Sequence, residues 1–127
     1  MLCSHLHYNI GQSYYHKSNY KKSIKHLQDA IKLEDQSLCA KTYLFLSYKQ
    51  LGKEYNQEEI FKLIKKEKNI EYDINYHLYQ LLEDTSYLEI AYSQVQEKAD
   101  NLEPDVAAKF LSYPIPKAIV EEWEKVK

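Results

Sequence analysis

A repeat of 34 residues is the feature that most constrains this chain. When Ser4, Leu38 and Tyr72 are taken as position 1 of three successive repeats, apolar or small residues mostly recur at four matching positions. A period of this length is typical of stacked helix pairs, because each repeat can bury its apolar face only against its neighbours. The matching residues, in repeat order, are Ile10, Leu44 and Leu78 (position 7); Gly11, Phe45 and Tyr79 (position 8); Tyr14, Tyr48 and Leu82 (position 11); and Leu27, Phe61 and Val95 (position 24).

The composition also favours helices. Two glycines and three prolines supply too few tight turns for an all-β protein. The longest apolar run is Tyr43 to Leu46, so we expect neither a membrane span nor a targeting segment. We predict N-caps at Asn19, Asp73 and Thr85 or Ser86. The predicted helices cover about 3–16, 20–34, 38–51, 56–67, 73–83, 86–102, 105–112 and 117–126.

The first repeat carries the most specific motif. It resembles the tetratricopeptide repeat (TPR), and it lacks only the family's tryptophan and proline, where it has His7 and Asp35. The small residues of such a motif let two antiparallel helices approach closely. The residues that carry the resemblance are Gly11, Tyr14, Tyr20, Ser23, Leu27 and Ala30.

The later repeats are degenerate. Phe45 and Tyr79 stand where the first repeat has Gly11, so these repeats depend on the period more than on the motif. The segment from Leu88 to Trp123 resembles the tail that closes TPR arrays in bacterial signalling and ATPase-linked regulators. A stack of helix pairs needs a terminal cap with one polar face, and this segment can supply it.

The repeats and the tail together predict the fold. We expect a single all-α domain over 1–127, a right-handed superhelical stack of about three TPR-like hairpins (about 4–37, 38–71 and 72–105) with capping helices over 104–127. The N-terminus shows no comparable cap. Either the chain is the C-terminal piece of a longer array, or its open end meets a partner, which would allow a homo-oligomer.

The resemblance also implies a binding surface, because in this family the first helix of each repeat lines a concave groove. Tyrosines there suit a peptide or protein partner, since each offers a large rigid area and a polar tip. The alternative is that these tyrosines pack between repeats or against the tail. The implied groove residues are Tyr8, Gln12, Tyr15, Thr42, Leu46, Lys49, Tyr76, Gln80 and Glu83, with His5, Cys39 and Asp73 at position 2.

Charge narrows the classes of partner. All 17 basic side chains are lysines, and the net charge is −2, which argues against nucleic-acid binding. Residues 1–68 carry 12 lysines and 7 acidic residues (+5), whereas residues 69–127 carry 5 and 12 (−7). The lysines Lys62, Lys65, Lys66 and Lys68 form a basic stripe, which is either a solvated face or a docking site for an acidic partner such as the C-terminal half of another copy.

Metal and catalytic sites are not expected. Cys3, His5 and His7 are too few and too close to the terminus to make a metal site, and no phosphate loop or catalytic triad is present. We therefore expect no cofactor and no enzyme activity. Two cysteines argue against a disulfide scaffold and favour a reducing compartment.

The sequence thus favours a non-catalytic interaction module of the bacterial cytoplasm that binds a protein or peptide in a groove. Two alternatives stay open. In the first, the chain is a regulatory or sensor fragment of a larger bacterial signalling protein or transcription factor. In the second, it is a self-assembling structural protein.

Overall fold

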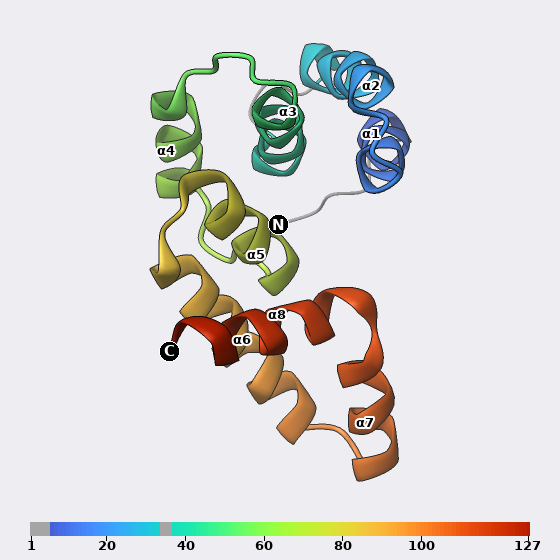
Figure 1. The fold of residues 1–127 in the computed structure, drawn as a ribbon, viewed down its shortest axis with the longest axis vertical. Coiled ribbons are helices and arrows are strands. Elements are labelled where there is room, and N and C mark those ends of the chain that lie inside the picture. The colour runs from blue at the N-terminus through green and yellow to red at the C-terminus, as the bar shows by residue number, and fades with distance from the viewer. Residues whose placement is uncertain (1–5, 34–36) are drawn as a thin grey trace. The chain divides into compact units, whose positions relative to one another are not determined.

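The fold consists of α-helices joined by short connections (Figure 1). The computed structural model describes residues 6–33 and 37–127, and within the first helix it describes side chains from Asn9 onward. Throughout this described part the only regular secondary structure is helical, so the all-α class is confirmed. The helices are α1 (Leu6–His16), α2 (Tyr20–Leu33), α3 (Leu38–Gln50), α4 (Gln57–Lys66), α5 (Tyr72–Leu82), α6 (Thr85–Asp100), α7 (Pro104–Ser112) and α8 (Pro114–Val126).

The helices divide into two compact units, Met1–Ile70 and Glu71–Lys127, which we call the N-terminal and the C-terminal unit. The boundary lies within a residue of the predicted junction between the second and third repeats. The superhelical stack and the single domain over 1–127 stay predictions, and each unit is described by itself. None of the described helices is both long and apolar enough to cross a bilayer.

In the N-terminal unit, α1 and α2 pack closely because small residues lie at their contact. A Cβ atom on Gly11 would lie 2.6 Å from Leu27 Cγ, so only glycine fits there without a shift. The Ser23 hydroxyl donates a hydrogen bond to the Gly11 carbonyl oxygen at 2.7 Å, and Ala30 is buried on the same helix. These are three of the small positions on which the TPR resemblance rests.

The next helix, α3, packs against α2 and α1, and α4 contacts α3. Most of α3 is buried, from Leu38 to Ser47, while α4 buries only Ile60 and Leu63. Both helices begin at side-chain caps that the sequence analysis did not identify. Ser37 accepts from the Ala40 backbone N–H, and Asn56 accepts from that of Glu58.

In the C-terminal unit, α5 and α6 form a hairpin, α8 packs on both, and α7 contacts α6 and α8. The C-terminal segment therefore contributes to the core of its own unit, as a cap would. One hydrophobic cluster of this unit comes from α6, α7 and α8, and α5 also buries Ile74, Leu78 and Leu81. The buried members of that cluster are Leu88, Ala91, Val95, Ala99, Phe110 and Ile119.

Some predicted helix ends need correction. Asn19 does lie before α2, where its side-chain oxygen accepts from the Lys22 N–H at 3.4 Å. Asp73 lies inside α5, which begins at Tyr72, and α6 is capped by Asp84 and not by Thr85 or Ser86. The last helix begins at Pro114 and not at residue 117, because proline suits the first turn of a helix, where its missing N–H costs no hydrogen bond.

Candidate functional site

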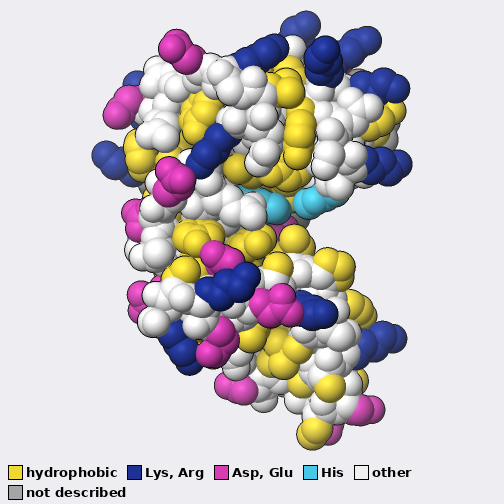
Figure 2. Space-filling model, viewed as in Figure 1, with side chains coloured by type: hydrophobic (Ala, Val, Ile, Leu, Met, Phe, Trp, Pro, Cys, Tyr) yellow, Lys and Arg dark blue, Asp and Glu magenta, His cyan; other side chains and the backbone are white. Residues whose placement is uncertain are grey.

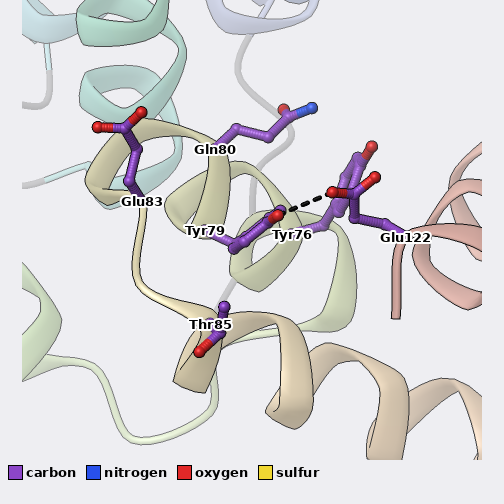
Figure 3. A pocket seen from close by; sticks show the side chains of 6 residues that line it. All are labelled: Tyr76, Tyr79, Gln80, Glu83, Thr85 and Glu122. Carbon is purple, nitrogen blue, oxygen red and sulfur yellow. Dashed lines mark hydrogen bonds between the residues drawn. The ribbon is translucent and has the colours of Figure 1, made fainter. Parts of the chain in front are cut away.

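A pocket of about 410 Å³ lies in the C-terminal unit (Figure 3). Its walls come from α5, the turn after α5, the start of α6, and α8. It is the best candidate site because several polar side chains converge on it. The lining residues are Tyr76, Tyr79, Gln80, Glu83, Thr85 and Glu122.

The spacing along α5 places three of these residues on one face. Tyr76, Tyr79 and Gln80 are three and four positions apart, which brings their side chains to the same side of a helix. Glu83 follows the helix in a left-handed conformation with φ 55°, and this backbone geometry ends α5. Thr85 is the first residue of α6, so the tight turn between the two helices completes this side of the pocket.

The opposite wall comes from α8 through Glu122. The Tyr79 hydroxyl donates a hydrogen bond to Glu122 Oε1 at 2.8 Å (Figure 3). The rings of Tyr76 and Tyr79 lie stacked, with their centroids 6.5 Å apart and their planes at 29°. Both rings are partly buried and pack against the core of the C-terminal unit, so their faces are held in place.

The carboxylates give the pocket a negative potential. The hydrogen bond to Glu122 raises the pKa of Tyr79 above its ordinary value, because it stabilises the protonated phenol. Burial, followed by the charges of Glu122 and Glu121, raises the pKa of Tyr76. Both phenols therefore stay neutral near pH 7 and remain hydrogen-bond donors.

Three of the predicted groove residues, Tyr76, Gln80 and Glu83, meet in this pocket. Sequence reasoning missed the other three. The repeat places Tyr79 at a packing position, although its spacing of three from Tyr76 also puts it on the same face of the helix. No sequence pattern pointed to Thr85 or Glu122 as site residues.

The predicted groove residues of the first repeat are only partly accessible. The Gln12 side chain is half-buried and donates to the Tyr43 hydroxyl at 3.2 Å. The Tyr15 ring is half-buried too, and it contacts the rings of Tyr20 and Tyr43. The Tyr8 side chain lies outside the described residues, as does His5.

The predicted groove residues of the second repeat are mostly buried. Thr42 is 0% and Leu46 is 1% exposed, and the Thr42 hydroxyl donates to the Leu38 carbonyl within α3. Such side chains present no surface to a partner. Lys49 is half-buried. A single groove through all three repeats stays a prediction.

The predicted basic stripe follows the outer face of α4. Lys62, Lys65 and Lys66 are exposed, whereas Ile60 and Leu63 of the same helix are buried. The fourth lysine of the stripe, Lys68, is exposed and lies beyond the end of α4. Figure 2 shows further lysine side chains gathered over α1 and α2.

The described cysteine and histidine side chains form no metal site. Within the described residues, no three His, Cys, Asp or Glu side chains gather in a way that would hold a metal ion. Cys39 is buried in α3. Cys3 and the side chain of His7 lie outside the described residues.

Comparisons with family models, with curated proteins and with solved structures found no match in any of the three. The resemblance to the TPR family therefore rests on the motif of the first repeat and on the 34-residue period.

Proposed function

We propose that this chain is a non-catalytic interaction module, built of TPR-like helix pairs, that binds a peptide or protein segment in the pocket of the C-terminal unit. One observation carries the proposal: Tyr76, Gln80 and Glu83, which the TPR resemblance implies on a binding face, line one pocket together. A TPR-like groove is the reason to expect a peptide there.

The composition of the pocket supports binding of this kind. Two tyrosine rings offer rigid area at a low cost in conformational entropy. The Thr85 hydroxyl can fix the register of a bound segment, and the Gln80 side chain is oriented by the contact of its Oε1 atom with His77 Nδ1 at 2.9 Å. A pocket of about 410 Å³ takes one or two side chains of a partner and not a whole helix.

A peptide library displayed on phage and selected against the full chain tests the proposal. We expect selected peptides to bind the parent chain and to lose at least tenfold in affinity for Thr85→Trp, because the indole fills the pocket from an exposed position. Ser93→Trp is the matched control, since Ser93 is exposed on the same helix and does not line the pocket. Equal binding by both variants would place the site elsewhere.

Self-association is the second candidate, and the charges of the two units favour it. The N-terminal unit carries +5 and the C-terminal unit −7, with exposed lysines on α4. Opposite charges on one chain suit head-to-tail contacts between copies. Sedimentation velocity of the full chain at low and high salt tests this candidate. Oligomers that dissociate as the salt concentration rises support it, and a monomer at both salt concentrations contradicts it. A regulatory fragment and a cytoplasmic location stay predictions.

A further inference from the structure

The pocket of the C-terminal unit combines two features that together suit a positive charge. It has two stacked tyrosine rings, and two of its six lining side chains are glutamates. Aromatic faces attract cations through their quadrupole, and a carboxylate beside the ring adds direct charge attraction. Neither feature would define a ligand alone, but a pocket that presents both selects for charge as well as shape.

Glu122 is the carboxylate that the geometry positions best. Its Oε1 atom accepts the Tyr79 hydroxyl at 2.8 Å, which fixes the side chain at the edge of the pocket. A carboxylate has about four acceptor positions, so this one bond leaves capacity for a ligand. Tyr76 and Tyr79 are partly buried and pack against the hydrophobic cluster of the unit, so their rings are held beside this carboxylate.

Aromatic rings of the same unit already bind a cation. The Lys98 ammonium lies 5.1 Å from the centroid of Phe110 and 5.7 Å from that of Tyr72. The unit also carries a charge of −7, which attracts a cationic segment from a distance and raises its rate of association.

We propose that the pocket binds an arginine side chain of a partner protein. This inference rests on the proposed function and names the chemistry of the segment that is bound. A planar guanidinium stacks on a tyrosine face while its N–H groups form paired hydrogen bonds with a carboxylate, which a lysine ammonium does less well. Because the chain itself contains no arginine, the preferred occupant comes from another protein and not from a second copy.

Blocked tripeptides provide the probes. The full chain is titrated with acetyl-Gly-Arg-Gly-amide and, as a neutral control of the same shape, with the citrulline peptide. The resonances of the Thr85 methyl group and of the Tyr76 and Tyr79 rings report binding by NMR. We expect the arginine peptide to shift these resonances and the citrulline peptide to bind at least tenfold more weakly. Equal binding of the two peptides would overturn the proposal, and so would a lysine peptide that binds as tightly as the arginine peptide.

Two variants that change the net charge by the same amount test whether Glu122 itself binds the arginine. Glu122→Gln removes the charge but keeps an acceptor for the Tyr79 hydroxyl, and we expect it to lose at least tenfold in affinity for the arginine peptide. Glu97→Gln changes the net charge equally at an exposed residue outside the pocket, and we expect it to bind like the parent chain. If both variants weaken binding equally, the attraction is non-specific and the proposal fails.

The outcomes separate this inference from the proposed function. Selected phage peptides that Thr85→Trp displaces, but that carry no excess of arginine, would leave the interaction module standing and refute the arginine site. If the arginine tripeptide binds in the pocket but no peptide of greater length binds, the arginine site would stand and the interaction module would be refuted.

Discussion

Leu27 occupies the space that a side chain at position 11 would need. A Cβ atom on Gly11 would lie 2.6 Å from Leu27 Cγ and 2.8 Å from its Cδ2, both in a buried side chain that cannot move freely. Gly11→Ala gains about 1 kcal/mol in helix propensity, but overpacking of a close helix pair costs about 1–3 kcal/mol. We expect a net loss of up to about 2 kcal/mol in the free energy of unfolding, measured by urea denaturation.

The control for this prediction shortens the neighbour. In a Leu27→Ala background the clash is gone, so adding Gly11→Ala should be neutral or stabilising there, as helix propensity alone dictates. If Gly11→Ala already stabilised the parent chain, the close contact between α1 and α2 would be contradicted.

The Tyr79–Glu122 hydrogen bond predicts a dependence on pH. It raises the pKa of Tyr79 above 10.0, the ordinary value, so the folded state favours the neutral phenol. The stabilisation is complete below pH 10 and is lost as the pH rises through the folded pKa. We expect Tyr79 to titrate above the ordinary value in an NMR titration of labelled tyrosine rings. Glu122→Ala, which removes the acceptor, should lower that pKa, and an unchanged titration in this variant would show that the bond is absent in solution.

The last helix, α8, should stabilise the C-terminal unit through its buried side chains. Ile119 of α8 is 0% exposed and packs in the core of the C-terminal unit. Ile119→Ala removes buried methyl groups and leaves a cavity, which costs about 2–5 kcal/mol. Val126→Ala on the same helix is the control, because Val126 is 39% exposed and its loss should cost less than about 0.5 kcal/mol. Similar melting temperatures for the two variants would contradict a capping role for α8.

The helices themselves could be predicted well from the sequence because their limits follow local rules. Pro104 starts α7, the period of apolar residues gives the length of each helix, and the small residues of the first repeat lie at the contact between α1 and α2. The helix caps were harder to predict from the sequence, because Asp84, Thr85 and Ser86 are all residue types that favour the N-cap position. The structure selects Asp84, whose carboxylate accepts from the Ser86 N–H at 3.0 Å.

The pocket could be predicted only on the α5 side. Tyr76 and Gln80 follow from spacing within one helix, whereas Glu122 meets Tyr79 across a separation of 43 residues that no local pattern encodes. On α3, by contrast, two of the residues expected on the binding face, Thr42 and Leu46, are buried. That helix is apolar around most of its circumference, so its pattern did not indicate that Thr42 and Leu46 would be buried.

The division into two units coincides with the division of charge. The boundary at residues 70 and 71 separates a unit of +5 from one of −7. Each unit has its own helix hairpin and its own buried side chains. Charge and packing thus change at the same point of the chain.

The hydrophobic cluster of α6, α7 and α8 consists of residues of the C-terminal unit, and from this we predict that the unit folds alone. All six buried side chains of this cluster and all six pocket-lining residues lie between 71 and 127. The single tryptophan, Trp123, stacks on Tyr92 with centroids 5.5 Å apart, so its fluorescence follows this unit, whereas circular dichroism follows both. We expect a fragment of residues 71–127 to be helical, to unfold cooperatively in urea and to bind the arginine tripeptide as the full chain does. In the full chain, the midpoints by fluorescence and by circular dichroism should differ, because two compact units of different stability lose their structure at different urea concentrations. An unfolded fragment together with coincident midpoints would instead show that residues 1–70 are needed to stabilise the C-terminal unit.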